Sequence, residues 1–125
     1  MSVLASGRVA LRIAGATELV RGDAILLARS VGNYTCLVTE VGEHSLRVPL
    51  GMVVEELRVF GLSRIHRSVA VNMAHVRRVV GRGRHRLCLV LSTGSEIEVG
   101  RSYQRSVRAA LGATTRRRSA TSLNG

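Results

Sequence analysis

Four side chains that could contact a phosphate or a base edge lie close together near the middle of the sequence. They are Arg64, His66, Arg67 and Ser68, and an apolar stretch from Val69 to Val71 follows them. This pattern predicts a short strand, a tight polar turn at residues 66–68 and a buried strand behind the turn. Such a turn presents a guanidinium, an imidazole and a hydroxyl together, and these groups contact phosphate oxygens and base edges. From these residues alone, the alternative is an exposed basic hairpin with no partner.

The positive charge of the chain is concentrated in its second half. The formal net charge is +11, and every basic residue other than histidine is an arginine. Residues 1–61 hold six arginines and six acids, whereas residues 62–111 hold ten arginines against Glu96 and Glu98. This asymmetry predicts a surface that binds a polyanion, with nucleic acid as the first candidate.

The residue types needed for catalysis or metal binding do not converge anywhere in the sequence. Asp23 is the only aspartate and is predicted to lie in a turn, and the histidines lack the spacing of metal ligands. Cys36 and Cys88 lie in separate apolar stretches, which predicts two buried free thiols. We therefore expect no enzymatic activity, no metal and no cofactor.

The apolar pattern predicts one mainly β domain with no membrane segment. The longest uncharged apolar run, Ala24 to Ala28, is far short of the roughly 20 residues that a spanning helix needs, so we expect a cytoplasmic protein. One helix is predicted to start at Leu50, with its apolar face over residues 50–57, and to end at Phe60-Gly61; a second is predicted at residues 102–111. In addition to the two strands of the central segment, strands are predicted at residues 8–13, 17–20, 24–28, 34–40, 45–48, 84–91 and 96–100.

These elements predict antiparallel sheets packed on one another, with one mid-chain helix and one short C-terminal helix. They argue against a helix-turn-helix, which needs three helical segments. Residues 1–111 are predicted to form the domain, and residues 112–125 a basic, disordered tail that carries Arg116, Arg117 and Arg118.

The predicted basic surface draws on three places in the chain. They are the loop at Asn33 and Tyr34, the turn at residues 64–68, and Gly100-Arg101. Arg101 follows a strand and opens a helix, where backbone amides also attract phosphate. Tyr34 could instead belong to the core, and Arg105 could be an ordinary solvated charge on the last helix.

The central segment, RIHRSVAVNMAHVRRV, resembles the signature of the LytTR-type DNA-binding domain of bacterial response regulators. The resemblance covers about residues 8–111 and includes Asp23 to Tyr34, Leu50 to Leu57 and Glu98 to Tyr103. It implies an elongated all-β domain that inserts loops into successive major grooves of double-stranded DNA and binds paired direct repeats as two copies. It leaves two arrangements open: a stand-alone regulator, or a longer protein in which a receiver or sensor domain precedes this one.

The resemblance assigns roles to individual residues. It assigns base reading to Arg67 and Arg101 in one groove, and to Asn33 and Tyr34 in the loop that enters the neighbouring groove. It assigns phosphate contacts to Arg64, His66, Ser68, Ser102 and Arg105. Asn72 and Tyr103 would close turns behind the site. Gly100 stands where the family usually has serine, which would remove one phosphate contact, and Ala24 and residues 26–28 depart from the first block of the family.

The sequence thus predicts a sequence-specific, double-stranded DNA-binding domain that regulates transcription. One alternative is a β domain whose basic surface binds an acidic protein partner, and another is an RNA or single-strand binder. Aromatic residues make up only 2 % of the chain, which counts against the stacking platforms that single-strand binders use.

Overall fold

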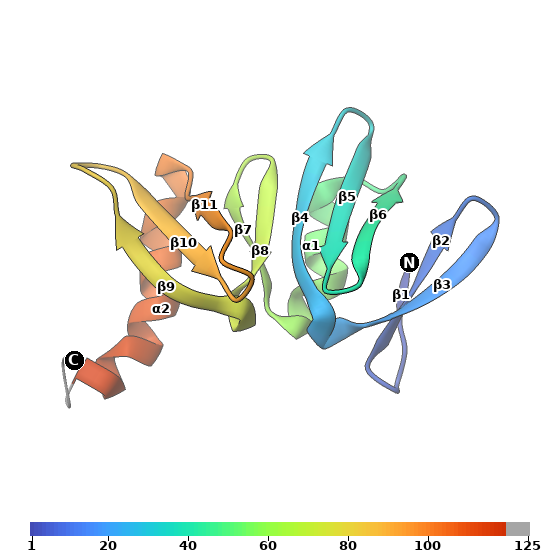
Figure 1. Ribbon diagram of the computed structural model, residues 1–125, viewed down its shortest axis with the longest axis horizontal. Helices are drawn as coiled ribbons and strands as arrows, with labels where there is room; N and C mark the ends of the chain where they lie inside the picture. The colour runs from blue at the N-terminus through green and yellow to red at the C-terminus, as the bar shows by residue number, and fades with distance from the viewer. Residues whose placement is uncertain (120–125) are drawn as a thin grey trace.

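The computed structural model describes the backbone of residues 1–119 and the side chains of residues 1–112. Three antiparallel sheets follow one another along the long axis of the molecule (Figure 1). The prediction of a mainly β chain with antiparallel sheets, a mid-chain helix and a C-terminal helix is confirmed. Within the described residues, no helix is both long enough and apolar enough to cross a membrane.

The first sheet has the order β1-β2-β3, and the central sheet has the order β6-β5-β4-β8-β7. The first sheet consists of β1 (Ser2–Val3), β2 (Arg8–Ile13) and β3 (Ala16–Arg21). The central sheet consists of β4 (Ile25–Val31), β5 (Tyr34–Thr39), β6 (Gly42–Leu46), β7 (Leu62–His66) and β8 (Val69–Asn72).

The third sheet has the order β11-β10-β9 and lies beside the C-terminal helix. Its strands are β9 (Val76–Gly81), β10 (Leu87–Leu91) and β11 (Glu96–Glu98). The two α-helices are α1 (Leu50–Leu57) and α2 (Gln104–Ser119). Single 3₁₀ turns connect the elements: η1 (Gly22–Ala24), η2 (Arg58–Phe60), η3 (Met73–His75) and η4 (Arg101–Tyr103).

The central sheet is buried on both faces because a separate apolar cluster packs on each. One cluster joins the first sheet and α1 to one face and includes Leu11, Leu37 and Leu57. The other joins the third sheet and α2 to the opposite face and includes Ile65, Leu89 and Val107. This arrangement explains why residues 25–28, the first part of β4, form a continuous apolar run rather than an alternating one.

Several predicted boundaries agree with the structure. β2 covers the predicted residues, and α1 is followed by a 3₁₀ turn that ends at Gly61. Gly61 has a φ of 102°, which is the left-handed conformation that favours glycine after a helix. Cys36 and Cys88 are buried free thiols, and burial raises the pKa of both.

The predicted bounds of β6 and β10 are wrong. The sequence placed a turn at residues 42–43, but the turn precedes Gly42, and β6 begins there instead of at residue 45. The hydroxyl of Thr39 makes the earlier turn possible, because it accepts from the amide of Val41 at 3.2 Å and donates to the carbonyl of Gly42 at 3.0 Å. β10 begins at Leu87, so residues 84–86 belong to the loop before it.

The predicted end of the last helix at Leu111 is also wrong, because α2 continues to Ser119. Gly112 does not end the helix, because one glycine inside a helix costs only about 1 kcal/mol relative to alanine. The next residues include alanine and arginine and no proline, so nothing in their sequence forces a stop. The predicted tail therefore begins within α2, and residues 120–125 lie outside the described residues.

Asn72 is a buried polar side chain that ties β8 to the segments beside it. Its exposed fraction is 0 %, and its amide nitrogen donates to the carbonyl of Ile25 at 2.7 Å. Its side-chain oxygen accepts from the amide of Ala74 at 3.0 Å, which caps η3. This agrees with the structural role that the sequence resemblance implied.

Replacing Asn72 by alanine should lower the free energy of unfolding by about 1–3 kcal/mol, because the carbonyl of Ile25 would be left buried without a donor. The matched control is Asn33→Ala, which removes the same amide from an exposed turn and should change stability by less than about 0.5 kcal/mol. Urea unfolding followed by circular dichroism measures both. Equal midpoints for the two variants would show that the Asn72 hydrogen bonds are dispensable.

Candidate nucleic-acid interface

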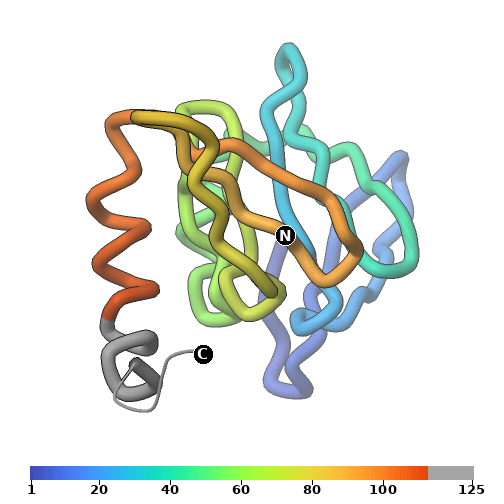
Figure 2. Tube along the Cα trace, turned by 60° about the vertical axis from the view of Figure 1, so that its left-hand side comes forward, coloured from blue at the N-terminus to red at the C-terminus, as the bar shows by residue number. Residues whose placement is uncertain are grey.

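Several turns that are distant in the sequence lie on one side of the molecule. The β4–β5 turn, the β7–β8 turn, the β9–β10 loop and the start of the C-terminal helical segment all lie at the top of Figures 1 and 2. We call this side the turn edge and define it by residues 32–34, 66–68, 82–86 and 100–105. Each of the three predicted places contributes to it.

The β7–β8 turn is held by the polar side chains around it. Arg64 is half-buried, and its guanidinium donates to the carbonyl of His66 at 3.3 Å and to the carbonyl of Arg67. The Nδ1 atom of His66 accepts from the backbone amide of Ser68 at 3.2 Å and lies 3.0 Å from its hydroxyl. Three of the four predicted polar side chains therefore make hydrogen bonds within the turn itself.

Arg67 differs from its neighbours in the turn. Its side chain is exposed, and within the described residues its guanidinium has neither a hydrogen bond nor an ion pair, so all five of its N–H donors face solvent. The turn is thus built so that one guanidinium projects from a fixed backbone.

The segment that carries Arg101 docks directly onto this turn. The amide of Gly100 donates to the carbonyl of Ile65 at 2.7 Å. A Cβ atom at Gly100 would lie 3.2 Å from Cδ2 and 3.4 Å from Cα of His66, so glycine allows an unusually close approach. A shallow hollow of about 460 Å³ lies at this junction and is lined by His66, Arg67, Gly100, Arg101, Ser102 and Tyr103. The structure therefore brings Arg67 and Arg101 together, although more than 30 residues separate them in the sequence.

The first turns after Gly100 present polar groups on the outside and apolar groups on the inside. Arg101, Ser102 and Arg105 are exposed, whereas Val107 is buried in the cluster beneath. Arg101 lies in η4 and Arg105 in the first turn of α2. The side chains of Ser102 and Arg105 have no partner within residues 1–112.

The β4–β5 hairpin projects beyond the β7–β8 turn. β4 pairs with β8 up to Arg29, and the amide of Ser30 donates to the carbonyl of Ser68 at 2.9 Å. Past this point β4 pairs only with β5, as far as Val31 and Tyr34. Asn33 is exposed at the tip of the hairpin.

Tyr34 lies on the surface, so the alternative that it belongs to the core is wrong. Arg47, which directly follows β6, contacts Tyr34: its Nε donates to the Tyr34 hydroxyl at 3.1 Å. The guanidinium carbon of Arg47 lies 5.2 Å from the centroid of the ring, a cation–π distance. Sequence reasoning missed Arg47, because the contact depends on the pairing of β5 with β6, and the predicted start of β6 was wrong.

The two acidic residues of the basic half are both neutralised by arginines. Arg82 forms a bidentate ion pair with Glu96 at 2.7 and 2.8 Å, and Arg86 forms a bidentate ion pair with Glu98 at 3.1 and 3.2 Å. The Arg82 pair lowers the pKa of Glu96 to about 2. The carboxylates therefore stay ionised and paired at neutral pH, which reduces their repulsion of an approaching polyanion.

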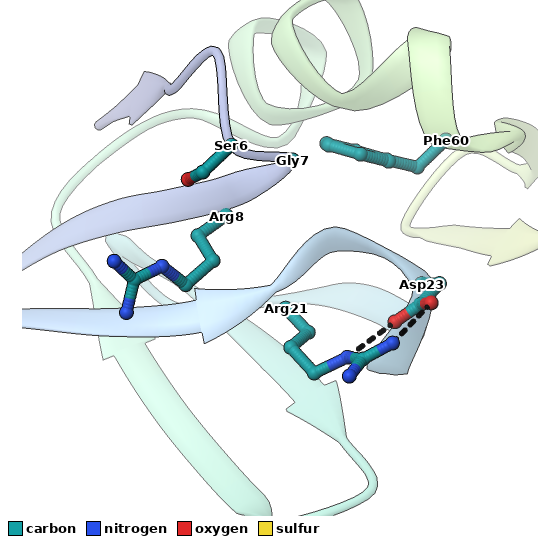
Figure 3. A pocket seen from close by; sticks show the side chains of 6 residues that line it. All are labelled: Ser6, Gly7, Arg8, Arg21, Asp23 and Phe60. Atoms are coloured by element: carbon teal, nitrogen blue, oxygen red, sulfur yellow. Dashed lines mark hydrogen bonds and ion pairs between the residues drawn. The ribbon is translucent and has the colours of Figure 1, made fainter.

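A second hollow lies between the first sheet and the 3₁₀ turn η2, which carries Phe60 (Figure 3). Ser6, Gly7, Arg8, Arg21, Asp23 and Phe60 line it. Its one carboxylate is paired with Arg21 at 2.8 and 3.0 Å, and this pair lowers the pKa of Asp23. Among the described residues, no group of three or more histidine, cysteine or acidic side chains could hold a metal ion. This hollow therefore offers no second carboxylate to act as an acid/base pair.

Comparison with known proteins links this fold to DNA binding. A protein-family model described as the LytTr DNA-binding domain matches residues 15–112. Among solved structures, the chain is similar to the LytTr DNA-binding domain of a Bacillus cereus protein described as a methyl-accepting/DNA response regulator. The identity is 21 %, the TM-score is 0.75, and the match covers 85 % of this chain and 97 % of that one. A search of curated proteins finds no match. Because the family model spans most of the chain, the protein belongs to the LytTr DNA-binding domain family, a family of DNA-binding regulators.

Proposed function

We propose that this domain regulates transcription by reading the major groove of double-stranded DNA with Arg67 and Arg101. The observation that carries the proposal is the pair of exposed arginines on two elements joined by the hydrogen bond between Gly100 and Ile65. An arginine can donate two hydrogen bonds to O6 and N7 of guanine, which is the commonest specific contact in the major groove. Two such arginines in a fixed relation can read bases at a fixed spacing.

The other residues of the turn edge would set the register on the duplex. Ser102 and Arg105 would contact phosphates beside the backbone amides of η4, where anions are favoured. Asn33 and Tyr34 would enter the neighbouring groove from the projecting hairpin. Arg64, His66 and Ser68 would contact phosphates only with atoms that the turn leaves free, because their remaining atoms hold the turn.

Two copies would bind paired direct repeats, and a receiver or sensor domain elsewhere in a longer protein would supply the signal. Such a regulator acts in the cytoplasm.

Replacing Arg67 or Arg101 by alanine should cost about 1–3 kcal/mol of binding free energy on the preferred site and blur the preference at one position. Selection of binding sites from random duplex DNA, with each variant run beside the wild type, measures both effects. Arg58→Ala is the matched control. Arg58 is an exposed arginine in η2, before the start of β7, whereas the β7–β8 turn follows the end of that strand. An unchanged motif and affinity in both reading variants would refute the assignment.

Replacing Arg105 by alanine should weaken binding to all sequences alike, because a phosphate contact carries no sequence information. The dependence of log K on log salt should become shallower by about 1. Titrations at several salt concentrations, on the selected site and on a scrambled duplex, measure this change. A loss confined to the selected site would instead identify Arg105 as a base reader.

Arg64→Lys distinguishes a turn-holding role from a phosphate contact. Lysine keeps the positive charge but lacks the planar fork that reaches the carbonyls of both His66 and Arg67. We expect weaker binding to the selected site, with little change on scrambled DNA, and amide shifts in residues 65–68 of the free protein by NMR. Wild-type behaviour of this variant would show that only the charge of Arg64 matters.

A further inference from the structure

The β9–β10 loop is an arginine-rich part of the turn edge. The proposed base-reading function gives it no role. It carries Arg82, Arg84 and Arg86 between the two strands. The loop lies at the end of the turn edge that is farthest from the β2–β3 hairpin, beyond the β7–β8 turn (Figure 1).

Three sets of contacts fix this loop in place. The amide of Arg82 donates to the carbonyl of Arg86 at 3.0 Å, which closes the loop. The guanidinium groups of the same two arginines are held by Glu96 and Glu98 on β11. The side-chain amide of Gln104, at the start of α2, donates to the carbonyl of His85 at 2.7 Å. The last contact ties the loop to the helical segment that carries Arg101.

Arg84 is the one arginine of this loop that is left without a partner inside residues 1–112. It follows Gly83, whose φ of 81° allows the chain to reverse at the tip, and its side chain is exposed. An unpaired guanidinium on an anchored loop binds a phosphate at a lower entropic cost than one on a mobile arm, because fewer backbone conformations are lost.

We propose that Arg84 contacts backbone phosphates of duplex DNA outside the segment read by Arg67 and Arg101, so that the third sheet extends the footprint at one end. This inference rests on the proposed function, because it requires a duplex that lies along the turn edge. The loop and the segment that carries Arg101 lie on the same side in both views (Figures 1 and 2), and Gln104 connects them. A duplex held at Arg101 therefore continues past Arg84 at one of its ends.

The test compares two duplexes that contain the site selected by the wild-type protein. The short duplex ends at the last selected position, and the long one carries about ten further random base pairs, one helical turn, at each end. Wild type should bind the long duplex roughly three- to tenfold more tightly, the range expected for one additional hydrogen-bonded contact. Arg84→Ala should remove most of this gain and leave affinity for the short duplex unchanged.

Two further variants separate the possible causes. Arg84→Lys should retain most of the gain, since a phosphate contact needs a positive charge rather than a planar fork. Arg58→Ala lowers the net charge equally and should retain the whole gain. Hydroxyl-radical footprinting of Arg84→Ala should show the protected region shortened at one end only.

The proposal and the function on which it rests fail in different ways. Equal losses on both duplexes, or no loss on either, would overturn the contact outside the site while leaving base reading by Arg67 intact. If no motif is selected by the wild-type protein, the proposed function itself fails. In that event the two lengths of a random duplex still test Arg84, and an unchanged length dependence in Arg84→Ala would overturn the phosphate contact as well.

Discussion

The close approach of Gly100 to the β7–β8 turn is the constraint on which the turn edge depends. The hydrogen bond from Gly100 to Ile65 fixes the backbone, and the absence of a side chain lets His66 pack against it. The Nδ1 atom of His66 accepts from the amide of Ser68 in the turn. The same ring therefore contacts both the β7–β8 turn and the segment that begins at Gly100. A serine at this position would press on His66. The glycine that departs from the family pattern therefore has a packing consequence in addition to the loss of a hydroxyl.

The apolar core beneath the turn edge transmits this constraint to the rest of the fold. Ile65, whose carbonyl receives the Gly100 amide, is fully buried in the cluster shared by the third sheet and α2. Val99 and Val107, on either side of η4, belong to the same cluster. The segment that carries Arg101 is thus held by apolar packing on both sides and by a hydrogen bond between them. Since packed aliphatic cores resist small shifts, the spacing of the two exposed arginines is a property of the whole domain.

Local patterns predicted the elements whose causes are local. The alternation of β2, the helical period of α1 and the glycine after it, and the polar turn at residues 66–68 all follow from neighbouring residues. The contact of Tyr34 with Arg47 depends on the pairing of β5 with β6, which brings together residues 13 positions apart. Arg64 is a different case, because its guanidinium donates to the carbonyls of His66 and Arg67, only two and three residues along the chain.

The distribution of paired and unpaired arginines shows how a strongly basic surface can still discriminate between sequences. Charge alone attracts every phosphate, so a surface of mobile arginines would bind DNA without preference. Here Arg64, Arg82 and Arg86 are used within the protein, where they fix backbone or neutralise glutamates. Arg67 and Arg84, which have no partner within residues 1–112, stand on the two turns that these contacts hold in place. Specific binding requires donors whose positions are set before DNA arrives, because ordering them on binding would consume the free energy that separates one sequence from another.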